Sequence, residues 1–275
     1  MIPSDDLFRS WFAALESRQL SRLTFAEVRR GLQALSRLYV ERPRGLGAGT
    51  ALEGAGKRAA FALFYTPLHF LLVREVARAL GAADLPPRVI SDLGCGTGAA
   101  GAAWATLATG PCQVTGIERS GWAVDEARWN YGLLGVRGRA IRGDLDGARL
   151  PGRRSGVVAA FTVNELDDAM RRRLLERLLA AGRRLARILV VEPIARRPFP
   201  WWDAWVDAFL AAGGRADLWR FQVELPERLR LLDRAAGMDH RELTGRSLWL
   251  DGTREPARVS GRAPGGSLTG GAPRA

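Results

Sequence analysis

From residue 88 onward, short runs of β-branched and apolar residues alternate with stretches whose apolar residues recur every three to four positions. Such alternation is typical of βαβ units, which build a parallel sheet covered by helices. We expect strands over 88–94, 113–118, 138–144, 155–165 and 186–193, and a last strand or hairpin over 240–250. The sequence therefore predicts an α/β fold with a doubly wound, mostly parallel, Rossmann-like sheet and helices on both faces.

The first 82 residues have a helical pattern, with apolar residues at spacings of three and four and one long apolar helix from about Lys57 to Leu80. This helical region is too long to be the single helix that often precedes the first strand of such a fold. We therefore expect an N-terminal helical cap over 1–82 and a Rossmann-like domain over 83–250. The Gly-, Pro- and Arg-rich segment over 251–275 has few apolar anchors and is predicted to be a disordered tail.

Composition excludes several classes of protein. We see no apolar run of the ~18 residues that span a bilayer, and the N-terminus has no signal-peptide pattern, so a cytoplasmic protein without a membrane partner is expected. The cysteines are Cys95 and Cys112 and the histidines are His69 and His240. These are too few and too scattered for a disulfide framework or a metal site, so we expect no metal.

A glycine-rich loop separates the first predicted strand from the helix that follows it. Its sequence is Asp92-Leu93-Gly94-Cys95-Gly96-Thr97-Gly98. Glycines allow the backbone to turn tightly and approach a ligand, and the helix N-terminus offers free N–H groups. The spacing alone fits two cofactors. Gly94, Gly96 and Gly98 match the G-x-G-x-G of methyltransferases, whereas Gly96, Gly98 and Gly101 match the G-x-G-x-x-G of dinucleotide enzymes.

Acidic residues at neighbouring strand ends favour the first of these two cofactors. Glu118 ends the second strand, 20 residues after Gly98, where a carboxylate can bind ribose hydroxyls. Asp92 suits a cationic ligand with a sulfonium, whereas it would repel a pyrophosphate. Asp144 follows the third strand, where it can accept the exocyclic amine of adenine while Leu145 lies against the ring. The sequence thus favours S-adenosyl-L-methionine over a nicotinamide cofactor.

The D-x-G-x-G-x-G loop, Glu118 and the Gly143-Asp144 pair resemble the first three motifs of class I S-adenosylmethionine-dependent methyltransferases over about residues 57–250. The resemblance implies cofactor contacts from these residues: Tyr65, Asp92, Gly94, Cys95, Gly96, Gly98, Glu118, Arg119, Asp144, Leu145 and Asn164. Tyr65 lies on the helix entering the fold, which can close over the cofactor, although a core or interface position is the more frequent role of such a residue.

Two further segments, residues 161–166 (FTVNEL) and 189–193 (LVVEP), resemble a narrower group. This group is the methyltransferase-like family associated with the mitochondrial small ribosomal subunit, which has bacterial relatives. Association with the small ribosomal subunit is therefore implied. The larger members carry a cysteine cluster that has no counterpart here, so no metal centre is carried over.

Candidates for the reaction itself stand after the fourth strand. Asn164 and Glu165 are the candidate catalytic residues, although Asn164 is equally typical of a helix cap. FTVNEL is not the N-P-P-Y sequence of amino-directed methyltransferases. A cluster of aromatic residues, either a substrate platform or core, follows the fifth strand: Phe199, Trp201, Trp202, Trp205, Phe209 and Trp219.

The formal net charge is +12, yet Lys57 is the one lysine in the chain. Such an arginine-rich excess fits an RNA partner or a coding bias equally well. We expect a methyltransferase acting on a small molecule or on RNA. The alternative is a cofactor-binding ribosome-assembly or RNA-binding factor without turnover, and a nicotinamide enzyme is a distant third.

Overall fold

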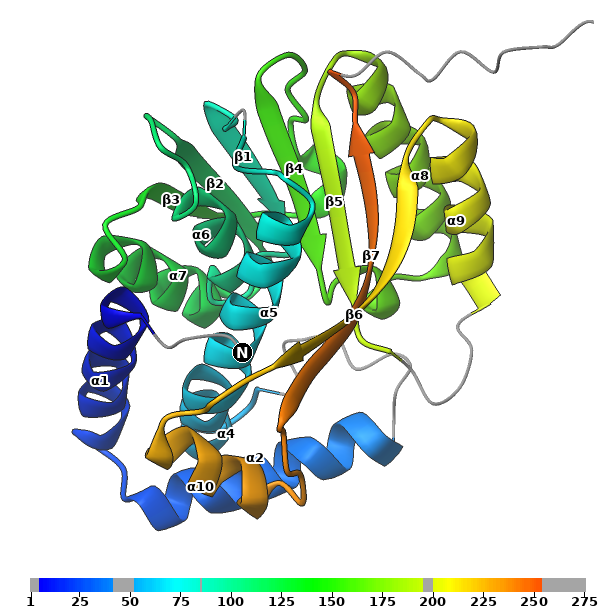
Figure 1. Ribbon diagram of the computed structural model, residues 1–275. Helices are drawn as coiled ribbons and strands as arrows, with labels where there is room; N and C mark the ends of the chain where they lie inside the picture. Colours follow the sequence, from blue (N-terminus) through cyan, green and yellow to red (C-terminus); the bar gives the residue numbers. More distant parts are fainter. Residues whose placement is uncertain (1–4, 42–51, 85, 195–199, 254–275) are drawn as a thin grey trace, which may run out of the picture.

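The computed structural model describes residues 5–41, 52–84, 86–194 and 200–253. Its strands form one sheet in the order β3-β2-β1-β4-β5-β7-β6 (Figure 1). The bounds are β1 (Val89–Leu93), β2 (Gln113–Glu118), β3 (Arg137–Arg142), β4 (Ser155–Ala160), β5 (Arg187–Glu192), β6 (Arg215–Gln222) and β7 (Glu242–Asp251). β1 to β5 are parallel, and β7 runs antiparallel to both β5 and β6. The predicted Rossmann-like α/β fold is confirmed.

Helices cover both faces of this sheet. The helices are α1 (Asp6–Leu20), α2 (Phe25–Glu41), α4 (Ala55–Ala60), α5 (Thr66–Ala79), α6 (Ala99–Ala105), α7 (Gly121–Leu133), α8 (Asp168–Arg183), α9 (Pro200–Ala211) and α10 (Glu227–Ala235). α5, α6 and α7 pack on one face, and α8 and α9 pack on the other (Figure 1). The described residues also contain three short helical segments: η1 (Phe61–Tyr65), η2 (Leu145–Gly147) and η3 (Val163–Glu165).

The N-terminal helices are built into this architecture. α1 packs against α7, and α2 packs against α4 and α10. Figure 1 shows α2, α4 and α10 grouped beyond the end of the sheet at which β4 and β5 terminate. The parallel strands therefore end beneath a layer of helices, where an enclosed site can form.

The continuous helical stretch over Ala55–Ala79 is 25 residues long and apolar enough to cross a membrane by length and composition. The expectation that no segment reaches this length is therefore wrong. However, 78% of its most apolar 18-residue segment is buried inside the protein. The stretch is apolar because it packs between α6 and the N-terminal helices, as a core helix does.

Several segments differ from the sequence predictions. β4 ends at Ala160 rather than at residue 165, because the chain turns at Phe161, which has a φ of +58°. The Trp-rich segment contains an edge strand, β6, that its pattern did not indicate. Trp202, Trp205 and Phe209 are buried on α9 and belong to the core. Phe199 and the predicted tail after Thr253 lie outside the described residues.

Candidate functional site

A cavity of about 480 Å³ lies where the parallel strands end. Leu93 of β1 pairs with Ile117 of β2, and Asp92 pairs with Val158 of β4, so the segments after these strands emerge side by side. The walls of the cavity are formed by the glycine loop, the ends of β2, β4 and β5, the helix η1–α5, and the start of β7. Eight predicted cofactor residues line it: Tyr65, Gly94, Cys95, Gly96, Glu118, Arg119, Leu145 and Asn164.

The three loop glycines have different surroundings, although each has a positive φ of +51° to +84°. A Cβ atom on Gly94 would lie 2.5 Å from Thr162 Cγ2, and one on Gly98 would lie 2.7 Å from Tyr131 Cε1. A Cβ on Gly96 would have no atom within 4 Å. Gly96 is therefore the glycine whose backbone faces open space. Gly98 does not line the cavity, and it permits close packing on α7 instead.

Asp92 lies beneath the loop rather than in the cavity wall, and only 1% of it is exposed. Its Oδ2 accepts the Gly101 N–H at 2.7 Å, in the first turn of α6, and its Oδ1 has no hydrogen-bond partner among the described residues. Burial raises the pKa of Asp92 to about 7, while the Gly101 hydrogen bond lowers it and nearby Glu118 raises it. This carboxyl group of β1 therefore fixes the start of α6, and with it the glycine loop that precedes α6.

Glu118, at the end of β2, reaches the cavity. Its Oε2 accepts the Gly96 N–H at 3.2 Å and its Oε1 accepts the Ser120 N–H at 2.8 Å. Arg119, the next residue, also lines the cavity. Because each carboxylate oxygen has more than one acceptor site, Glu118 can still bind hydroxyl groups while it holds the loop.

The segment after β3 only partly follows the prediction. Gly143 and the buried Leu145 line the cavity, whereas Asp144 is exposed and does not line it. Asp144 instead occupies the position before η2. The described structure therefore offers an apolar contact from Leu145 and no cavity contact from the Asp144 side chain.

The turn after β4 is held by a buried carboxyl group. Glu192, fully buried at the end of β5, accepts the Val163 N–H at 2.8 Å and the Asn164 side-chain N–H at 2.6 Å. Asn164 Oδ1 in turn accepts the Trp201 indole N–H at 3.2 Å. Burial raises the pKa of Glu192 to about 8, although the backbone hydrogen bonds lower it. Asn164 is thus fixed in orientation in the cavity wall.

Glu165 also lines the cavity, as predicted. Its side chain is exposed, yet the surrounding cavity walls desolvate it and raise its pKa to about 7; the charge of Glu118 raises the pKa further and the charge of Arg119 lowers it. The structure therefore brings both candidate catalytic residues, Asn164 and Glu165, to the cavity.

The opposite wall is the helix η1–α5, which is locally a π-helix over Phe61–Tyr65. Pro67 lacks an N–H and cannot donate to the carbonyl four residues earlier, and the Thr66 N–H bonds to Phe61 O in the π pattern. Burial raises the pKa of Tyr65 to about 12. The His69 ring stacks on Phe161 with centroids 3.7 Å apart, and burial lowers its pKa to about 3.

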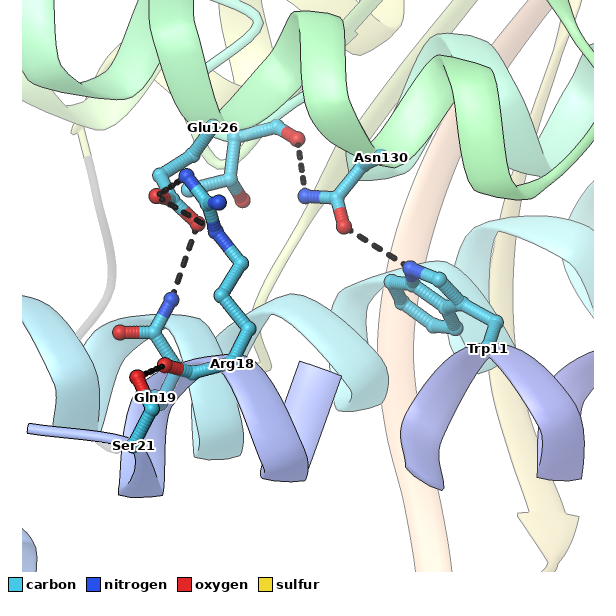
Figure 2. A network of polar contacts seen from close by, with 7 residues as sticks. Trp11, Arg18, Gln19, Ser21, Glu126 and Asn130 are labelled. Carbon is cyan, nitrogen blue, oxygen red and sulfur yellow. Dashed lines mark hydrogen bonds and ion pairs between the residues drawn. The ribbon is translucent and has the colours of Figure 1, made fainter. Parts of the chain in front are cut away.

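The N-terminal helices hold the glycine loop through residues that the sequence analysis missed. Asn130 of α7 donates from Nδ2 to Thr97 O at 2.9 Å and accepts the Trp11 indole N–H at 2.8 Å (Figure 2). The Thr66 and Thr97 hydroxyl oxygens are 2.7 Å apart. Thr97 is therefore tied both to α5 and, through Asn130, to α1. No local spacing connects Trp11 with Asn130, which are 119 residues apart.

A second contact joins α1 to α7. Glu126 is 5% exposed and accepts Arg18 Nη2 at 2.9 Å and Gln19 Nε2 at 3.0 Å (Figure 2). Ser21 in turn donates to Arg18 O at 2.7 Å. Buried charges require such pairing, so this contact fixes where α1 lies on the domain.

Residues 90–184 match the family described as "Methyltransferase domain". Residues 90–184 are a methyltransferase domain. The matched segment runs from β1 to the end of α8 and so includes the glycine loop, Glu118, Leu145 and Asn164. A comparison with curated proteins finds no match.

Among solved structures, this chain is similar to mitomycin 7-O-methyltransferase MmcR, with 15% identity over 90% of this chain and 69% of that one and a TM-score of 0.47. A SAM-dependent methyltransferase from Aquifex aeolicus has 17% identity over 67% and 93% of the two chains and a TM-score of 0.44. Magnesium protoporphyrin IX methyltransferase from Synechocystis PCC 6803, solved with bound SAM, has 17% identity over 66% and 79% and a TM-score of 0.40.

Proposed function

We propose that this methyltransferase transfers a methyl group from S-adenosyl-L-methionine to a small, largely apolar molecule. The observation that carries the proposal is the composition of the wall opposite the glycine loop. Phe61, Phe64, Leu68 and Leu72 line it from η1 and α5, and Leu243 lines it from β7. A cavity of about 480 Å³ lies in the ~300–1,000 Å³ range of small-molecule sites, and an apolar wall favours an apolar acceptor.

We propose that the glycine loop, Glu118 and Leu145 hold the cofactor. Three features support this. Gly96 has open space where a side chain would stand, Glu118 presents a carboxylate to the same cavity, and Leu145 supplies an apolar surface. In this arrangement Glu118 binds the ribose hydroxyls, Leu145 contacts the adenine, and Arg119 and Tyr65 lie at the edges. Asp92 supports the loop indirectly through its hydrogen bond to the Gly101 N–H, and Gly98 and Asp144 make no direct contact.

The cofactor supplies a methyl group on a sulfonium sulfur, which is already activated for transfer. The protein therefore has to align the acceptor and exclude water. Asn164, fixed by Glu192 and Trp201, is placed to position a polar group of the acceptor. The buried apolar side chains of η1 and α5 exclude water from the same volume.

We further propose that, within residues 1–82, the helices α1, α2 and α4 act as a cap over the acceptor end of a catalytic domain that spans residues 83–250, whereas α5 of the same region packs on the sheet. The position of α2 and α4 beyond the strand ends supports this division (Figure 1). A cap of this kind makes the acceptor site more enclosed than a surface that reads RNA. RNA remains the competing acceptor because of the net charge of +12.

Turnover to S-adenosylhomocysteine, measured with a panel of apolar small molecules and with ribosomal RNA, tests the proposal. We expect turnover with a member of the first group. Leu68→Trp, which adds volume at a buried lining position, should abolish it and leave S-adenosylhomocysteine binding intact. Leu218→Trp, at a leucine that is 73% exposed on β6, is the matched control. Turnover with RNA alone, or salt-sensitive binding to the small ribosomal subunit, would favour the RNA acceptor.

A further inference from the structure

His240 lines the same cavity from the loop between α10 and β7. Its Nδ1 lies 2.5 Å from Asp233 Oδ1, and its backbone N–H donates to Asp233 Oδ2 at 2.6 Å. Asp233 is on α10 and is 1% exposed, whereas the His240 side chain is 30% exposed. Both oxygens of a buried carboxyl group therefore contact one histidine.

This contact selects the tautomer of the imidazole. The carboxylate accepts, so Nδ1 carries the proton and Nε2 keeps its lone pair. A buried carboxylate that holds Nδ1–H is also the arrangement that orients the histidine of a general-base site. His240 is thus oriented and equipped to accept a proton at Nε2.

The other titratable side chains of the cavity are less suited to this role. His69 is stacked on Phe161, and its low pKa keeps it from taking a proton near neutral pH. Tyr65 stays protonated because burial raises its pKa. Glu192 is occupied by donors from the turn after β4.

Three further groups lie on the cofactor side of the cavity or close to it. Glu118 holds backbone N–H groups of the glycine loop and of Ser120. Cys95 is buried, and burial raises its pKa well above the usual value. The charges of Glu118 and Arg119 both act on Glu165, so Glu165 lies beside the residues that we propose hold the cofactor. Of the described lining residues, His240 is the one whose ring is backed by a buried carboxylate.

We propose that His240, oriented by Asp233, is the general base that removes the proton from a hydroxyl group of the acceptor. This inference rests on the proposed function and deepens it: the acceptor is a phenol or alcohol, and the product is a methyl ether. The O–H bond breaks and its proton passes to Nε2. The oxygen electron pair bonds to the methyl carbon, and the carbon–sulfur electrons stay on sulfur. The proton leaves to solvent through the exposed part of the ring.

Two substitutions and one control test this role. In His240→Asn the new amide can still donate to Asp233, which preserves the loop contact but removes Nε2. Asp233→Asn keeps the imidazole and removes its charged partner. Asp239→Asn, one residue before His240, changes a carboxylate that is 64% exposed and should behave as wild type. Denaturant unfolding and S-adenosylhomocysteine binding check that each variant is folded.

The first readout involves no turnover. 4-Nitrophenol absorbs visible light only when it is ionised, so its spectrum reports proton loss. With protein saturated by S-adenosylhomocysteine, the wild type should raise the ionised fraction of bound 4-nitrophenol, and His240→Asn should not. The second readout is the pH profile of methylation across a panel of phenols. His240→Asn should lower kcat/KM by about 10²–10⁴-fold, with the smallest loss for acidic phenols and recovery at alkaline pH.

The outcomes separate this inference from the proposed function. Equal methylation of phenols by wild type and His240→Asn at every pH would overturn the role of His240 and leave the proposed function standing. A wild type that binds S-adenosylhomocysteine but neither binds nor methylates any small molecule of the panel would overturn both. Methylation of amines alone would overturn the hydroxyl acceptor and the base together.

Discussion

Replacing Gly96 by alanine should separate cofactor binding from folding. Gly96 has a φ of +51°, and a Cβ there would meet no atom within 4 Å. An L-residue in this left-handed conformation costs about 1–2 kcal/mol, and no packing clash adds to it. The methyl group would, however, stand on the loop surface that we propose faces the cofactor. We therefore expect a small loss of stability and a loss of cofactor affinity greater than tenfold.

Gly98→Ala, in the same loop, should instead lower mainly the stability of the protein. Its φ is +84°, and the new Cβ would lie 2.7 Å from Tyr131 Cε1 and 3.0 Å from Ala127 Cβ. Backbone strain and overpacking together should lower the free energy of unfolding by about 2–5 kcal/mol. Gly110→Ala, at an exposed glycine with no neighbour within 4 Å, is the control.

The assay pairs urea unfolding with calorimetric titration of S-adenosylhomocysteine for wild type and all three variants. Affinity should fall sharply in Gly96→Ala with a small decrease in the unfolding midpoint, and the midpoint should fall most in Gly98→Ala. Wild-type affinity in Gly96→Ala would refute the reasoning, because the cofactor would then not approach this backbone.

Two further predictions concern buried polar groups. Asn130→Leu leaves the Trp11 N–H and the Thr97 carbonyl without their present partner, so we expect the unfolding free energy to fall by about 2 kcal/mol or more. Cofactor binding should weaken as well, because Thr97 belongs to the glycine loop. Unchanged cofactor binding would show that α1 does not support the loop. Burial raises the pKa of Glu192 to about 8, so its folded state holds a proton that the unfolded state loses above about pH 4.5. The unfolding free energy should therefore fall as pH rises from about 5 to about 8, less steeply in Glu192→Gln; an identical slope in both proteins would contradict this.

The strands near the cofactor loop were predictable because their signals are local. β2 has the predicted bounds of Gln113–Glu118, and β1 and β5 differ by one residue at each end. Buried parallel strands are continuous apolar runs, which stand out in a sequence. β6 lies at the exposed edge of the sheet, where Leu218 is 73% exposed, so its pattern carried no such signal.

The acidic residues show where prediction from spacing ends. Asp92 lies near the end of β1, as expected, but its side chain faces α6, where it accepts the Gly101 N–H, and does not line the cavity. Asp144 is one residue before the buried Leu145 yet is exposed. Sequence position fixes which strand end a residue is near, whereas the direction of its side chain depends on where the strand stops.

The remaining functional contacts are long-range. Trp11 with Asn130, and Thr66 with Thr97, join residues that no motif relates. Asp233 and His240 are seven residues apart, but their contact depends on the turn between α10 and β7. Such pairs follow from tertiary packing, which a single sequence does not reveal.

The central claim is that the cavity beside the glycine loop binds S-adenosyl-L-methionine, and direct calorimetric titration of the wild-type protein tests it best. We predict saturable binding of one equivalent, competition by S-adenosylhomocysteine, and no binding of NAD. Absence of binding at high micromolar S-adenosyl-L-methionine, or saturation by NAD instead, would contradict the account.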